Sequence, residues 1–114
     1  MQEKFIEALD PSSAVDYNSQ VYTSLATSIY SGNVNIAQLL LTKTALPIDY
    51  AGQTGNTALI FASMWGHVDT VSYLLGSGAD VALFNAQGES ALSLAMKNGH
   101  RDVVLLLRAA GATQ

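Results

Sequence analysis

The stretch from Gly55 to Ala62 reads GNTALIFA, and the stretch from Gly88 to Ala95 reads GESALSLA. The second stretch lies 33 positions after the first and carries the same or a similar residue type at most places. The residues GHVD at 66–69 recur as GHRD at 99–102, and the Gly-Ala pair at 78–79 recurs at 111–112. A fixed period of this length is typical of stacked repeats, in which each unit relies on its neighbours to bury its apolar face.

The period and the first-helix opening resemble the ankyrin repeat family, whose units carry a β-turn and two helices. The segments 57–62 and 90–95 resemble the opening of the first helix of such a unit. The pairs Gly66-His67 and Gly99-His100 resemble the turn between its two helices. The resemblance implies a stack of helical hairpins with a concave surface that binds partners.

A weaker copy lies upstream of these two units. The residues Val-Asp-Tyr at 15–17 precede Ile-Asp-Tyr at 48–50 by 33 positions, whereas Gly32 precedes Gly66 by 34. We expect the extra residue to lie in the loop around residues 44–47. The segment Phe5–Leu9 reads as a lone helix that corresponds to the second helix of an incomplete unit.

These patterns predict an all-α fold, an ankyrin-type solenoid of stacked helix-turn-helix repeats with about three full units and an N-terminal half unit. We expect a single ankyrin repeat domain over residues 1–114. Its expected parts are an N-terminal capping helix at 1–14, a degenerate repeat at 15–47, a repeat at 48–80 and a C-terminal capping repeat at 81–114.

The best-defined unit shows how a hairpin is encoded. Thr57 is a good N-cap, because its hydroxyl can accept a hydrogen bond from an unpaired backbone N–H. Gly66 is expected to end the first helix, where a positive φ is easiest without a Cβ. Val71 and Leu74 continue a three- and four-residue apolar spacing that predicts the buried side of the second helix.

The last unit departs from this pattern. Arg101 takes the place of Val68, and Arg108 takes the place of Leu75. Terminal units of a solenoid need a polar outer face, so these arginines predict a C-terminal cap. Leu105 is the exception, and we expect it to leave an apolar spot on that face.

The composition restricts the partners of the chain. It has 114 residues with a net charge of −4, and its five basic residues are spread along the sequence rather than clustered, so nucleic-acid binding is not expected. The longest apolar runs are far too short to cross a bilayer, so we expect no membrane insertion. The absence of cysteine excludes disulfides and thiolate metal sites; it favours a cytoplasmic location and leaves the periplasm and other compartments open.

Catalysis is not expected, and we predict no catalytic, cofactor-binding or metal-binding residue and no cofactor. The only histidines are His67 and His100, one unit apart, and we expect each ring to bond local backbone. Equivalent positions of stacked units lie about 10 Å apart, which is too far for one metal ion. Asp69 and Asp102 are expected to favour the N-terminal ends of the second helices through the helix dipole.

The resemblance implies that partners meet the turn tips and the outer positions of the first helices. Large apolar groups at these positions, above all Trp65, favour a contact surface, because aromatic residues and methionine are enriched in interface cores. The alternative is that Trp65 folds back over the second helix and is partly buried. The predicted partner-binding residues are Tyr17, Tyr30, Gln53, Asn56, Met64, Trp65, Phe84, Gln87, Lys97 and Asn98.

Two functions remain open from the sequence. The first is a non-catalytic module, monomeric when alone, that binds a protein or peptide partner through its concave face and acts as an inhibitor or regulator of that partner. The second is a structural role, as a self-associating or tethering segment of a larger ankyrin assembly.

Overall fold

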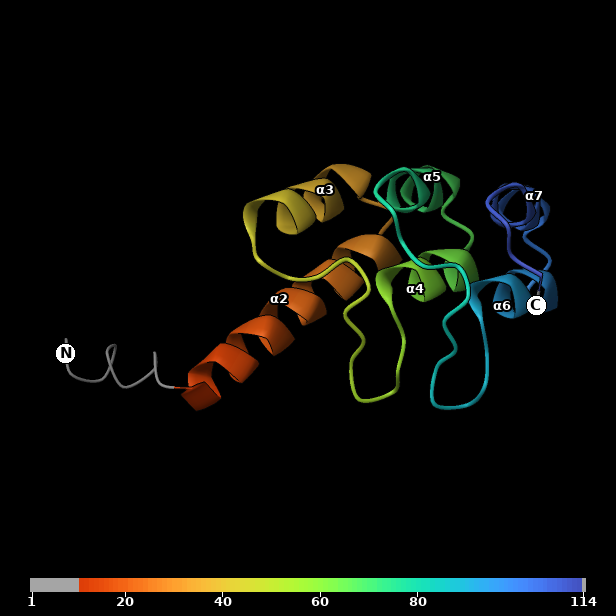
Figure 1. Ribbon diagram of the computed structural model, residues 1–114. Coiled ribbons are helices and arrows are strands. Elements are labelled where there is room, and N and C mark those ends of the chain that lie inside the picture. The colour runs from red at the N-terminus through yellow and green to blue at the C-terminus, as the bar shows by residue number, and fades with distance from the viewer. Residues whose placement is uncertain (1–10, 114) are drawn as a thin grey trace.

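The computed structural model describes residues 11–113 of the chain. Within that range the chain forms six α-helices in three antiparallel pairs (Figure 1). The first helices of the pairs are α2 (Pro11–Tyr30), α4 (Ala58–Trp65) and α6 (Ala91–Lys97), and the second helices are α3 (Val34–Lys43), α5 (Val68–Gly76) and α7 (Arg101–Ala109). The expected all-α repeat solenoid is therefore confirmed.

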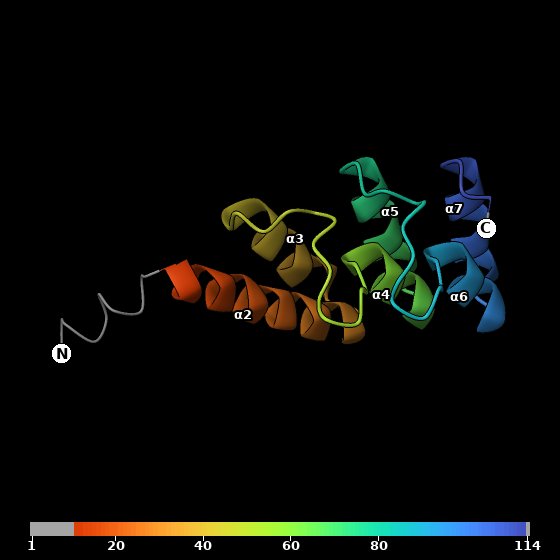
Figure 2. The same cartoon turned by 60° about the horizontal axis from the view of Figure 1, so that its bottom comes forward.

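The helices are arranged in two layers. α4 packs between α2 and α6 in the first-helix layer, and α5 packs between α3 and α7 in the second-helix layer (Figure 2). Loops of equal length, residues 44–57 and 77–90, carry the chain from one pair to the next. In the described residues the only β-pairing is an isolated antiparallel bridge between Phe84 and Ser90 in the second of these loops.

The helix ends follow the local sequence. Thr57 caps α4 by accepting a hydrogen bond from the Ile60 amide, and Gly66 ends α4 with a φ of +77°, both as predicted. At α6, Ser90 and Ser93 exchange side-chain and backbone hydrogen bonds in a capping box. These caps satisfy amides that the first turn of a helix leaves unpaired.

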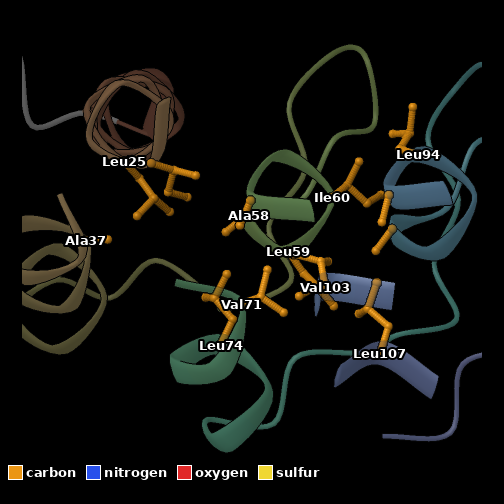
Figure 3. Close-up of a cluster of buried hydrophobic side chains, with 14 of the residues drawn as sticks. Leu25, Ala37, Ala58, Leu59, Ile60, Val71, Leu74, Leu94, Val103 and Leu107 are labelled. Carbon is orange, nitrogen blue, oxygen red and sulfur yellow. The ribbon is translucent and has the colours of Figure 1, made fainter. Parts of the chain in front are cut away.

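Buried aliphatic side chains join the two layers (Figure 3). Leu59, Val71 and Leu92 are almost completely buried, as a stack of sheltering hairpins requires. Alanine residues at 58, 62, 91 and 95 are also buried in the first-helix layer, and their small size allows adjacent helices to approach closely. The shared core therefore runs between units rather than inside each one.

The N-terminal part differs from the sequence prediction. α2 is one continuous helix of 20 residues, so the boundary expected between residues 14 and 15 falls inside a helix, and Tyr17 lies on a helix rather than at a turn tip. The physical reason is that residues 12–30 contain neither glycine nor proline, and Pro11 occupies the first helical position, where its missing N–H is harmless. The lone helix expected at Phe5–Leu9 lies outside the described residues.

The extra residue of the first full unit also lies elsewhere than expected. The two inter-pair loops have equal length, whereas α3 has ten residues and α5 has nine. The last turn of α3 is extended by Thr44, whose hydroxyl donates a hydrogen bond to the Leu40 carbonyl. The insertion is therefore absorbed by the helix and not by the loop around residues 44–47.

Candidate functional site

Five aromatic rings form a continuous row across the first two units. We call this row the aromatic strip, and its members are Tyr50, Tyr22, Phe61, Trp65 and Tyr30. Successive ring centroids lie 5.3, 6.0, 4.9 and 5.0 Å apart in that order. The helices α2 and α4 pack side by side (Figure 2). Their rings therefore meet across the junction between the first two units.

The geometry at Trp65 fixes the centre of the strip. Its ring stacks on Phe61, one helical turn earlier, with an interplanar angle of 2°. Tyr30 meets the same indole edge-on, at 82°, from the end of α2. Such aromatic pairs contribute about 0.5–1.5 kcal/mol beyond the area they bury. Trp65 is therefore half-buried and held rigidly, while Tyr30 is 66% exposed beside it.

The alternative that Trp65 is partly buried is correct, but its partners are not those expected. The indole packs against Phe61 of α4 itself and against Tyr30 of α2. The strip is thus part of the surface and also part of the junction between the first two units.

The other end of the strip is anchored by Tyr22. Its hydroxyl donates a short hydrogen bond to the Asn56 carbonyl, 34 positions away. Gly52 lies against the ring so closely that a Cβ there would be 2.6 Å from a ring carbon. Burial raises the pKa of the Tyr22 hydroxyl; the Gly52 backbone lowers it by a smaller amount, and the nearby Tyr50 raises it further.

The part of the strip on α2 and α4 lies among residues without charge. The sequence of α4 contains no ionisable acid or base, and neither does α2 from Tyr17 to Tyr30, tyrosine hydroxyls aside. The nearest basic residue of the first-helix layer is Lys97 at the end of α6, which pairs with Glu89 at 3.7 Å. A partner that covers the strip would therefore meet apolar surface and tyrosine hydroxyls.

The structure brings some predicted site residues together and separates others. Trp65 and Tyr30 touch, and Met64 is linked to Asn98, whose side-chain amide donates to the Met64 carbonyl at 3.1 Å. Lys97 adjoins Asn98 at the end of α6. These five residues form one group at the ends of the first helices.

A second group lies in the turns. Asn56 is half-buried, and its side-chain oxygen accepts a hydrogen bond from Asn85, which also braces the backbone of Gln87. Gln53 is exposed, and Phe84, in the loop before α6, is 52% exposed. Asn56 thus serves the turn-to-turn contact, whereas Gln53 and Phe84 remain available to a partner.

Tyr17 lies on the exposed side of α2, about three turns before Tyr30. The predicted partner-binding residues include neither Tyr22 and Tyr50 nor Phe61. The signal for Phe61 was present, because residues four apart on a helix face each other and Trp65 follows at that spacing.

Each of the two histidines forms the same kind of hydrogen bond to the preceding unit. Nε2 of His67 lies 3.1 Å from the Tyr30 carbonyl, and Nε2 of His100 lies 3.0 Å from the Met64 carbonyl. A carbonyl only accepts, so Nε2 carries the hydrogen in both rings. The partner carbonyls belong to the preceding unit, which corrects the expectation of local bonds.

Nothing in the described part of the chain gathers acidic and histidine side chains into a group of three that could hold a metal ion. Asp69 and Asp102 lie in the first turns of α5 and α7, where the helix dipole favours a negative charge. Within residues 11–113, no helix combines the length and the apolar content that a bilayer crossing needs.

The fold and this surface define an all-α repeat solenoid with a row of aromatic side chains on its first-helix layer. The sequence matches the family described as ankyrin repeats (3 copies) over residues 2–85 and again over residues 46–114, so the chain belongs to the ankyrin repeat family. Ankyrin repeats generally mediate protein–protein interaction and are generally non-catalytic.

Several characterised proteins share the repeats. The human Notch-regulated ankyrin repeat-containing protein is 36% identical over 83 residues, which is 70% of this chain and 73% of that protein. Mouse serine/threonine-protein kinase TNNI3K is 33% identical over 88 residues, 69% of this chain, and the probable E3 ubiquitin-protein ligase XBOS33 of Oryza sativa subsp. japonica is 37% identical over 84 residues, 73% of this chain. The match spans only 11% of the kinase and 16% of the ligase.

Proposed function

We propose that this chain is a non-catalytic binding module that holds one protein or peptide partner on the concave side of its stack, centred on the aromatic strip. The observation that carries this proposal is the exposed Tyr30 packed edge-on against Trp65, between two helix segments without charged side chains. Tyrosine and tryptophan are enriched among residues that dominate binding energy, and rigid rings lose little entropy when a partner binds.

The proposed contact includes both groups of residues. Met64, Lys97 and Asn98 border Trp65 at the helix ends, and Gln53 and Phe84 extend the surface along the turns. The chain acts as a monomer and, by covering the partner's surface, as an inhibitor or regulator of it. Partner-binding through ankyrin repeats in general supports the mode of action, and the strip supports the place.

The test is a selection of peptides from a random display library on the intact chain. Peptides that bind are then measured by calorimetry against Tyr30→Ser and Trp65→Ala. Truncating a central aromatic anchor is expected to weaken binding by about tenfold or more. Leu39→Ser is the matched control, because Leu39 is a large exposed apolar residue of the second-helix layer, and affinity should not change.

The Tyr30→Ser variant separates a loss of binding contacts from a loss of folding. Trp65 contributes to the junction between units, so its loss also lowers stability, whereas Tyr30 is largely exposed. Equal affinities for the wild-type chain and for Tyr30→Ser and Trp65→Ala, with helical content retained, would reject the proposal.

A further inference from the structure

The outer surface of the last unit carries an apolar hollow bordered by two arginines. We call it the end face, and its members are Met96, Gly99, Arg101, Val104, Leu105 and Arg108. These residues line a shallow hollow of about 430 Å³. Leu105 is 67% exposed and Met96 is 52% exposed, the highest values among the large apolar residues of α6 and α7. The predicted cap is therefore polar only at its arginines.

The end face repeats a surface that, at the two junctions inside the stack, is covered by a histidine ring of the next unit. The His67 ring lies over Gly32, 3.2 Å from where a Cβ would be, and the His100 ring lies over Gly66, 2.5 Å from where a Cβ would be. At Gly99, the third glycine of the series, no atom of residues 11–113 lies within 4 Å of that point. The surface that accepts the next hairpin inside the stack is thus repeated here, and no other part of the described chain covers it.

The positive charge at the border of the end face favours an occupant with acidic side chains. Only five residues of the chain are basic, and two of them, Arg101 and Arg108, border the end face, although the net charge of the chain is −4. The Arg108 guanidinium lies 3.8 Å from the Met96 sulfur, so its charge is held at the edge of the apolar hollow. Carboxylates beside an apolar stripe would complement this arrangement.

We propose that the end face docks an acidic amphipathic helix from a partner protein, which lies against α6 and α7 as the next helix of the stack. Its apolar side covers Leu105 and Met96, and its carboxylates pair with Arg101 and Arg108. This surface is separate from the aromatic strip, so the inference does not depend on the proposed function.

A second copy of the chain fits the end face poorly. On α3 of such a copy, the exposed apolar residues Ile36 and Leu39 are accompanied by Lys43 and by no carboxylate. Asn33 stands where the later units have histidine, and its side chain already caps α3. Docking through α3 of a copy would therefore bring like charge and no ring for Gly99, which favours a different protein as the occupant.

The test uses three synthetic helical peptides of about 18 residues, long enough to form a marginal helix. All three have leucine at the i, i+3, i+4, i+7 spacing; the flanking positions are glutamate in the first, lysine in the second and glutamine in the third. The glutamate peptide should bind the intact chain most tightly and the lysine peptide most weakly. Amide shifts in the NMR spectrum should cluster in residues 95–108.

Variants assign the contact. Leu105→Glu should weaken the glutamate peptide by about tenfold or more, since one buried leucine contributes that much. The double change Arg101→Glu and Arg108→Glu should reverse the preference toward the lysine peptide. Leu39→Ser should leave the affinity unchanged, because Leu39 lies on α3 at the other end of the stack. Leu105→Ser, which copies Ser72 of the preceding unit, replaces Leu105→Glu if the latter loses helical content.

Four results would overturn the inference: no binding of the glutamate peptide, equal binding of the glutamate and lysine peptides, shifts confined to the aromatic strip, or unchanged affinity in the folded Leu105 variant. Self-association of the chain in a concentration series that Leu105→Ser abolishes would also overturn it, because the occupant would then be a second copy.

Discussion

Replacing Gly66 by alanine should destabilise the protein far more than replacing Gly99. The two glycines have φ of +77° and +76°, so the left-handed conformation disfavours alanine equally at both, by about 1–2 kcal/mol. They differ in what the new methyl group meets. At Gly66 it would lie 2.5 Å from Nδ1 of His100, whereas at Gly99 it would meet nothing within 4 Å.

The difference in unfolding free energy between the two variants measures the contact that His100 makes with the preceding unit. The His100 ring must move away from an alanine at position 66, so its hydrogen bond to the Met64 carbonyl is lost, at about 1 kcal/mol. Repacking the displaced ring costs about 1–3 kcal/mol more. We therefore expect Gly66→Ala to exceed Gly99→Ala by about 2 kcal/mol or more. Gly32→Ala should fall between them, because its methyl would lie 3.2 Å from the His67 ring.

The assay is urea unfolding followed by circular dichroism, with the slope of the transition checked for two-state behaviour. A double-mutant cycle with His100→Ala isolates the clash, because the penalty at Gly66 should shrink to that of Gly99 once the ring is gone. Equal losses of stability at Gly66 and Gly99, or a Gly66 penalty that persists without His100, would refute this account of the His100 contact.

Three further predictions concern single side chains and the strip. Thr70→Val should raise the free energy of unfolding by about 1 kcal/mol in urea titrations. Within residues 11–113 the buried Thr70 hydroxyl has no hydrogen-bond partner, and the equivalent residue of the last unit, Val103, is fully buried. A loss of stability would show that the hydroxyl does have a partner. Burial keeps Tyr22 protonated in the folded state above its ordinary pKa of 10.0, so unfolded chains ionise first and stability should fall as the pH rises above about 10. Thermal melts of Tyr22→Phe should lack that part of the fall, and identical pH profiles would contradict the assignment. Binding of library-selected partners to the uncharged strip should change little between about 0.05 and 0.5 M salt in calorimetry, whereas a steep salt dependence would place the contact elsewhere.

Much of the fold could be predicted because it repeats. The 33-residue period fixes the hairpins from Ile48 onward, and local chemistry at Thr57 and Gly66 fixes their ends. The first unit could not be placed in the same way, since its match to the others is weak. There the absence of helix breakers in 12–30 outweighed the analogy with later turns and produced one long helix.

The candidate site was only partly predictable for a different reason. Tyr30 and Trp65 follow from their positions at the ends of first helices. Their contact with each other, and the chain of rings through Phe61 and Tyr22, depends on how α2 and α4 are oriented against each other. The same is true of His100, because the distance between adjacent units decides that its ring reaches the Met64 carbonyl.

Trp65 is the only tryptophan of the chain, and it lies where α2 meets α4. Its intrinsic emission therefore reports on that junction without any label. Separation of the first unit from the second would expose the indole to water and shift its spectrum, while loosening of α7 at the far end would leave it unchanged. Intrinsic tryptophan fluorescence therefore reports opening at this junction separately from loosening at the far end of the stack.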